Sequence, residues 1–305
     1  MKKTISIIVP SYNEENNIFA LYTKVTEQFL NQKQYDYEII FVNDGSNDNT
    51  SGEVEKIALH DSCVRLIEFS RNFNKEIAIS AGYGYACGDA VVVIDADLQH
   101  PPELITEMIC LWEKGSEVVI GVRDANLGAS MIKKIGSYIF FQAMAHMGDV
   151  RLVYGETDFC LIDKKVVVEF RKLKERVRTT RCLIEWLGFK KEYIHFVAAK
   201  RNDGKSRYTF FKLCKFAIST LLMHSMAPFM FAGFFGFIIS AAAAIIFFLQ
   251  GFLKLPSNVI GLIIIFLMGV NLACLGVLFF YLNILRKEVI ARPLYIVRRT
   301  LNIVP

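Results

Sequence analysis

Two long stretches without a charged residue constrain how this chain can fold. No Asp, Glu, Lys or Arg lies between Lys215 and Lys254, and none lies between Lys254 and Arg286. Each stretch exceeds the roughly 20 residues that a helix needs to cross a bilayer. We therefore expect a hairpin of two membrane-spanning helices, at 229–249 and 259–282.

The residues that flank this hairpin predict its orientation. Lys and Arg are frequent before the first span and after the second, whereas the connecting turn, Lys254–Asn258, contains one basic residue. Cytosolic segments next to membrane spans are enriched in Lys and Arg, so we expect a multi-pass protein of the plasma (inner) membrane with both termini in the cytosol. The apolar run Ile5–Val9 is too short for a signal peptide.

Basic residues near the spans also indicate the kind of partner. The formal net charge of the chain is only +5. Positive charge next to a bilayer suits anionic head groups and phosphate-bearing ligands, and we expect no nucleic acid partner. Two apolar segments with lysines could lie in the membrane interface, although the first fits a core helix equally well: 128–148 and 208–226.

Short apolar runs alternate with amphipathic stretches in the N-terminal part of the chain. Strands that alternate with helices predict an α/β fold with a parallel sheet and helices on both faces. The expected strands are Ile5–Val9, Glu38–Val42, Val64–Phe69, Ala90–Ile94 and Glu117–Ile120. The expected helices include Glu15–Leu30, Glu76–Cys87 and Pro102–Lys114.

Polar motifs follow four of these expected strands. Ligands of such sheets bind beyond the carboxyl ends of the strands, so we expect the motifs to form one site. They lie at 10–14, 43–46, 70–72 and 95–97.

The last of these motifs has the composition of a metal site. Asp95 and Asp97 follow the apolar run Val91–Ile94, and Gln99 lies two residues further on. Hard divalent cations prefer oxygen ligands, and Mg²⁺ is usually held by one or two carboxylates together with substrate phosphates. We therefore predict that Asp95, Asp97 and Gln99 bind Mg²⁺ or Mn²⁺ with a diphosphate.

Two further acids stand at the ends of neighbouring expected strands. Asp44 lies in the turn Asn43–Ser46, and Glu14 follows the first strand. A turn of this composition can be purely structural. A carboxylate at a strand end can also accept hydrogen bonds from a nucleobase or ribose, and the pair of acids favours that interpretation.

Taken together, these motifs resemble those of inverting family 2 glycosyltransferases, which have the Rossmann-like GT-A fold. Within that family the chain is similar to the polyprenyl-phosphate enzymes, namely bactoprenol glucosyltransferases and dolichol-phosphate mannose synthases. The matching segments are Ile8–Glu15, Val42–Ser46, Ser70–Glu76, Asp95–Glu103, Arg201–Tyr208 and Arg292–Arg299. The resemblance implies a cytosolic catalytic domain, a juxtamembrane segment, two spans and a basic cytosolic tail, at 1–207, 208–226, 227–285 and 286–305.

The resemblance also implies roles for individual residues. The residues expected to bind the nucleotide-sugar are Pro10, Tyr12, Glu14, Asp44, Asp95, Ala96 and Asp97. Those expected near the donor diphosphate and the acceptor phosphate are Arg123, Arg201 and Arg207. Asp158 matches the acid proposed as the base in bacterial relatives, and Asp97 and Arg123 complete the expected catalytic set.

A phosphate monoester, however, is already largely ionised at pH 7. We therefore expect Asp158 to orient groups more than to remove a proton. The chain departs from the family pattern at two positions, because Asn74 stands where Gly is usual and Cys160 stands where Arg is usual. The loss of an arginine next to Asp158 weakens the group of positive charges that the resemblance implies for holding the acceptor phosphate.

The reaction implied by the resemblance is transfer of glucose from UDP-glucose to undecaprenyl phosphate, for modification of O-antigen, which is part of lipopolysaccharide, or of another cell-surface glycan. GlcNAc, galactose and mannose remain open, because no side chain can be assigned to the sugar. A non-catalytic scaffold is one alternative. A processive polysaccharide synthase is another, but the chain lacks a Gln-X-X-Arg-Trp motif. The relatives imply a homo-oligomer, such as a tetramer.

Overall fold

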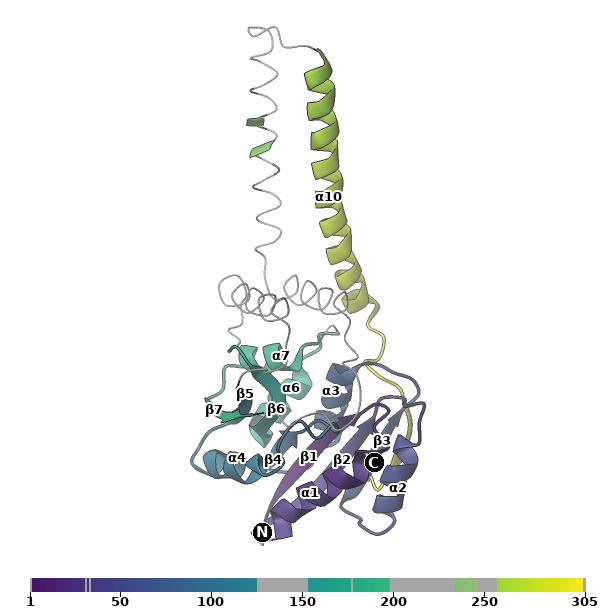
Figure 1. Ribbon diagram of the computed structural model, residues 1–305, viewed down its shortest axis with the longest axis vertical. Helices are drawn as coiled ribbons and strands as arrows, with labels where there is room; N and C mark the ends of the chain where they lie inside the picture. Colours follow the sequence, from purple (N-terminus) through teal and green to yellow (C-terminus); the bar gives the residue numbers. More distant parts are fainter. Residues whose placement is uncertain are drawn as a thin grey trace. The chain divides into compact units, whose positions relative to one another are not determined.

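A computed structural model of the chain describes residues 2–124, 153–197 and 257–303, except 31, 33 and 177, together with seven isolated positions between 234 and 245. The chain divides into two compact units (Figure 1). One contains the described residues up to 197 and also 293–303, and the other contains those from 234 to 292. The expected interfacial segments at 128–148 and 208–226 lie outside the described residues.

A sheet of eight strands forms the centre of the first unit. The strand order is β7-β5-β6-β4-β1-β2-β3-β8. The strands are β1 (Lys3–Ser11), β2 (Tyr35–Asn43), β3 (Val64–Phe69), β4 (Ala90–Val93), β5 (Val118–Arg123), β6 (Glu156–Asp163), β7 (Lys191–Phe196) and β8 (Val297–Leu301). The first five correspond to the strands expected from the sequence, and the last three are additional.

The sheet is mixed and not parallel throughout. Strands β1 to β5 run in one direction, as the alternation of strands and helices predicted. β6 lies antiparallel between β4 and β5, and β8 lies antiparallel to β3. The expectation of a parallel sheet is therefore wrong at these two strands, because an apolar run indicates a strand but not its direction.

Helices cover both faces of this sheet (Figure 1). Ile7 and Val9 of β1 pack in one apolar core with residues from three helices, and Ile8, between them, packs in a second core with residues from three others. Successive side chains of a strand point to opposite faces, so one strand contributes to both cores. The helices of the first core are α1 (Ile18–Leu30), α2 (Thr50–Ala58) and α4 (Leu104–Glu113). Those of the second are α3 (Lys75–Tyr85), α6 (Lys164–Lys172) and α7 (Thr180–Trp186).

The second unit contains the long helix α10 (Ser257–Ile290). It begins inside the turn expected at 254–258, continues past 282 and contains the whole of the expected second span, 259–282. Within it, Phe266–Ile290 is long and apolar enough to cross a membrane, and it is the one such helix among the described residues. Most of the first expected span, 229–249, lies outside the described residues.

The segment after α10 contributes to the sheet of the first unit. Val297–Leu301 forms the edge strand β8, and Tyr295 stacks on Phe69 of β3 with 5.0 Å between ring centroids. The segment expected as a basic tail, 286–305, therefore contains parts of two elements. Its first residues, up to Ile290, belong to α10, and Val297–Leu301 form an edge of the sheet.

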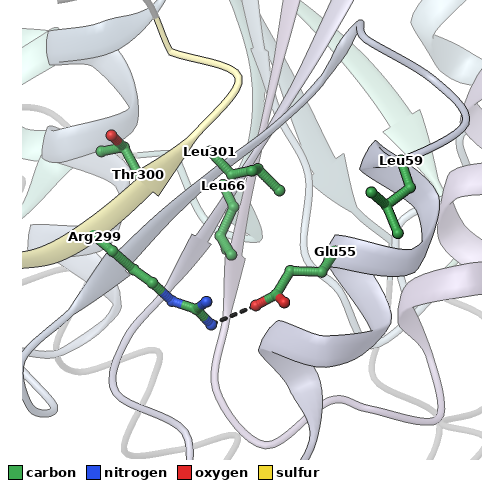
Figure 2. A pocket seen from close by; sticks show the side chains of 6 residues that line it. All are labelled: Glu55, Leu59, Leu66, Arg299, Thr300 and Leu301. Atoms are coloured by element: carbon green, nitrogen blue, oxygen red, sulfur yellow. Dashed lines mark hydrogen bonds and ion pairs between the residues drawn. The ribbon is translucent and has the colours of Figure 1, made fainter.

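Ion pairs hold β8 against the rest of the unit. Arg299 Nε lies 2.6 Å from Glu68 Oε2 of β3, and the same guanidinium contacts Glu55 of α2. Figure 2 shows Arg299 and Glu55 beside Leu66 and Leu301, which line the same shallow pocket. Glu68 is only 8% exposed, and a buried carboxylate is stabilised by partners such as Arg299.

Candidate active site

The carboxyl ends of three neighbouring strands meet at one edge of the sheet. Ser11 of β1 pairs with Asn43 of β2, and Ile8 of β1 pairs with Val93 of β4. The loops that follow these strands therefore leave the sheet side by side. As the sequence predicted, this brings together the motifs at 10–14, 43–46 and 95–99.

Hydrogen bonds join the first two loops. The backbone N–H of Asn13 donates to Ser46 Oγ at 2.9 Å, and the side-chain oxygen of Asn13 accepts from the backbone N–H of Asn47 at 2.8 Å. This fixes the relative position of the loops that carry the residues predicted to hold the nucleoside. On the first loop these are Pro10, which is buried, and Tyr12 and Glu14, which are partly buried.

Asp44, the fourth predicted nucleoside residue, also organises a third loop. Its Oδ1 accepts from the backbone N–H of Phe73 at 2.6 Å, and its Oδ2 accepts from that of Asn74 at 2.9 Å. Burial raises the pKa of Asp44 to about 6, although these two hydrogen bonds oppose the increase. Next to it, Gly45 has a φ of 65°, and a Cβ there would lie 2.4 Å from the carbonyl carbon of Arg71. The loop after β3 thus packs tightly on the loop after β2.

Asn74 adopts a backbone conformation that favours glycine. Its φ is 83° and its ψ is 153°, a region that residues with a Cβ rarely occupy. This is the position at which the sequence departs from the family's usual Gly. The chain keeps the glycine conformation with an asparagine, because Asp44 holds the N–H of Asn74 and the next residue, Lys75, begins α3.

The loop after β4 is held by a buried histidine. The backbone N–H of Asp95 donates to His100 Nδ1 at 3.3 Å, and the His100 ring stacks on Phe159 with 5.1 Å between centroids. Burial lowers the pKa of His100, so the ring stays neutral and can accept this bond. Ala96 is buried, and Asp97 Oδ1 accepts from the backbone N–H of Gln99 at 3.2 Å.

A lysine that the sequence analysis did not select connects two of the predicted site residues. Lys75 Nζ lies 2.6 Å from Asp95 Oδ1 and 2.7 Å from Asp158 Oδ2. Arg181 of α7, which was also missed, places its Nε 3.0 Å from Asp158 Oδ1. The position of Lys75 inside the motif Ser70–Glu76 was the one available signal, whereas nothing in the sequence around Arg181 indicates a site.

These cations determine the charge of the two acids. Burial alone would raise the pKa of Asp158, but Lys75 and Arg181 hold it well below its usual range. Burial likewise opposes ionisation of Asp95, and Lys75 lowers its pKa. A carboxylate that is paired with two cations is a poor proton acceptor. The geometry therefore agrees with an orienting role for Asp158.

The arginines predicted from the sequence are only partly described. Arg123, at the end of β5, donates from Nη2 to Gln99 Oε1 at 3.2 Å, so it lies next to the predicted metal ligands. Arg201 and Arg207 fall outside the described residues. Cys160 is buried, with its sulfur 3.8 Å from Tyr83 Oη, and the guanidinium that contacts Asp158 comes from Arg181 instead.

The predicted metal ligands offer oxygen atoms only. Among the described residues, no three His, Cys, Asp or Glu side chains are grouped so that they could hold a metal ion. Asp95 and Asp97 supply two carboxylates, and Gln99 can add an amide oxygen. This donor set fits a hard divalent cation that takes its remaining ligands from phosphate oxygens and water.

Comparison with known proteins identifies the family. The sequence profile of Glycosyl transferase family 2 matches residues 6–170. The chain belongs to this family. Two relatives match almost the whole chain. An uncharacterised glycosyltransferase, YkcC of Bacillus subtilis, is 39% identical over 98% of this chain and 94% of its own length. A prophage bactoprenol glucosyl transferase homologue of Escherichia coli is 31% identical over 97% of this chain and 98% of its own.

Solved structures share the fold of this family 2 glycosyltransferase. Glucosyl-3-phosphoglycerate synthase of Mycobacterium tuberculosis, in complex with Mn²⁺, UDP and phosphoglyceric acid, has a TM-score of 0.51 at 19% identity and covers 72% of this chain and 76% of its own. TarS of S. aureus with UDP-GlcNAc has a TM-score of 0.50 at 16% identity, and the match covers 74% of this chain and 68% of the TarS chain. These likenesses confirm the GT-A fold predicted from the resemblance.

The strained conformation at position 74 leads to a test of stability. We expect Asn74→Gly to increase the free energy of unfolding by about 1 kcal/mol, because glycine removes the strain of the Cβ at little cost. Asn72→Gly is the matched control, since Asn72 has no positive φ, and it should decrease stability. Thermal denaturation of the full-length protein in detergent measures both. A lower melting temperature for Asn74→Gly than for the wild type would contradict the assignment of strain.

Proposed function

We propose that this glycosyltransferase transfers a hexose, with glucose from UDP-glucose as the first choice, to undecaprenyl phosphate or a similar polyprenyl phosphate. The observation that carries the proposal is the nearly full-length similarity to relatives named bactoprenol glucosyl transferase. The arrangement of acids at one edge of the sheet supports it, because a nucleotide-sugar needs both a nucleoside site and a site for its diphosphate.

The donor would lie across the three loops at this edge. Pro10, Tyr12, Glu14 and Asp44 would hold the nucleoside, and the hydrogen bonds between their loops support a preformed site. Asp95, Ala96 and Asp97 would face the diphosphate. The backbone at Asp95 is held by His100, which supports a loop that is in place before a ligand binds.

Asp95, Asp97 and Gln99 would hold a divalent cation, Mg²⁺ or Mn²⁺. When bound, it would neutralise the negative charge that develops on the leaving diphosphate. Arg123 lies close enough to Gln99 to contribute positive charge to the same group. Asp97 and Arg123 would thus act on the leaving diphosphate. Its developing negative charge is what a single inverting displacement most needs to stabilise.

The acceptor needs orientation more than activation. A polyprenyl phosphate is already largely ionised at pH 7, so a strong general base is not required. Asp158 would orient the groups around the attacking oxygen through its ion pairs with Lys75 and Arg181. Arg201 and Arg207 would position the acceptor phosphate, since guanidinium groups bind phosphates in a planar, bidentate geometry.

A membrane location follows from the acceptor. Burial of a prenyl chain is worth about 0.8 kcal/mol per CH₂, so the enzyme must bind the phosphate at the bilayer surface. The apolar helix α10 supports attachment to the membrane. We propose that it pairs with a first span at 229–249 in a hairpin, with the catalytic unit in the cytosol, the segments at 128–148 and 208–226 at the interface, and several copies in a homo-oligomer.

Two substitutions separate the roles of the acids. We expect Asp97→Asn to reduce transfer by about 100-fold or more, because it removes stabilisation of the leaving group. Asp158→Asn should reduce transfer by less than the roughly 100-fold expected when a general base is lost. Single-turnover assays measure both, with thermal denaturation as a check on folding. Equal losses, or a larger loss for Asp158→Asn in a folded variant, would contradict this division of roles.

A substrate panel tests the reaction itself. Membranes that contain the protein are incubated with undecaprenyl phosphate and each of several radiolabelled nucleotide-sugars, with and without EDTA. We expect UDP-glucose to give a labelled, solvent-extractable lipid that EDTA abolishes, and membranes with Asp97→Asn to give little. No labelled lipid from any sugar would refute the transferase assignment, and only long polymers on a gel would indicate a processive synthase.

A further inference from the structure

Lys75 stands where a helix disfavours a cation. It is the first residue of α3, and the N-terminus of a helix carries partial positive charge that repels a lysine ammonium. The ammonium is nevertheless held in place, 2.6 Å from Asp95 Oδ1 and 2.7 Å from Asp158 Oδ2. The two carboxylates therefore determine the position of this side chain, and they oppose the preference of the helix.

The two carboxylates differ in their other partners. Asp158 has a second cation, Arg181, at 3.0 Å. Asp95 has one Lys or Arg partner in the described part of the chain, Lys75; the Nδ1 of the nearby His100 accepts the backbone N–H of Asp95 and lies 3.8 Å from its carboxylate. Loss of Lys75 would thus leave Asp158 paired and Asp95 unpaired.

Asp95 is also one of the acids proposed to hold a divalent cation. The Lys75 ammonium lies within 3 Å of an Asp95 oxygen. A metal ion on the same carboxylate would lie close to this ammonium, and the two positive charges would repel each other strongly. The two positive charges are therefore alternatives on Asp95. Lys75 can move away from Asp95 and keep its ion pair with Asp158.

We propose that Lys75 neutralises Asp95 in the metal-free enzyme and releases it, while it keeps Asp158, when a divalent cation binds. Lys75 is then a positioning residue that weakens metal binding in the absence of the nucleotide. Diphosphate oxygens supply further ligands, so the metal would bind well only together with the donor. The inference rests on the metal role of Asp95 and Asp97 in the proposed function.

The test measures binding of Mn²⁺ alone to the full-length protein. We expect Lys75→Met to bind Mn²⁺ about tenfold more tightly than the wild type, because a competing cation has been removed. Isothermal titration calorimetry without nucleotide gives the affinity. Mn²⁺ should also raise the melting temperature of Lys75→Met more than that of the wild type. A role of Lys75 in folding alone would produce neither gain.

Four further variants make the result specific. Lys75→Arg keeps the charge and should retain the affinity of the wild type. Lys165→Met removes a lysine that pairs with Glu117 outside the site, and should change nothing. In Lys75→Met with Asp95→Asn, the gain should disappear. If Lys75→Met does not fold, Lys75→Gln replaces it and is judged in the same way.

An unchanged or weaker affinity for Mn²⁺ in the folded Lys75 variant overturns the proposal. So does a gain that persists after Asp95→Asn. Because the probe is the metal alone, the result does not depend on which sugar or lipid is used. Failure of the proposed function would appear separately, as a wild-type protein that binds Mn²⁺ yet forms no labelled lipid.

Discussion

The ion pairs of Lys75 connect parts of the site that are far apart in the sequence. The ammonium joins Asp95, after β4, to Asp158, on β6. The preceding residue, Asn74, donates its backbone N–H to Asp44, at the end of β2. Two consecutive residues therefore link the predicted nucleoside site to the predicted metal site. Such a link offers a physical route by which occupation of one site affects the other.

The edge segment that contains Tyr295 and β8 packs on β3, the strand that precedes the loop with Asn74. Phe69 is the last residue of β3, five positions before Asn74, and Tyr295 stacks on it. Tyr295 belongs to the segment that follows α10, so the chain that leaves the apolar helix ends against the strand that carries the loop. The ion pairs of Arg299 with Glu68 and Glu55 fasten the same segment. The strand that carries the loop after β3 is thus supported by a segment that is distant in the sequence.

The strands and the site loops were predictable because their signals are local. An apolar run followed by Asp95 and Asp97 indicates a strand end with a polar function, whatever the rest of the chain does. β8 was missed because its pairing with β3 is a contact between distant segments. Arg181 was missed for the same reason, since only the packing of α7 brings it to Asp158. The departure at Asn74 was seen in the sequence, but its positive φ required the structure.

The most direct test of this account is an experimental structure of the full-length protein with Mn²⁺ and UDP. The account predicts Mn²⁺ on Asp95 and Asp97, with Lys75 Nζ beyond about 4 Å from Asp95, outside ion-pair distance, and still paired with Asp158. Mn²⁺ bound elsewhere, or Lys75 still between both carboxylates with the nucleotide in place, would contradict it.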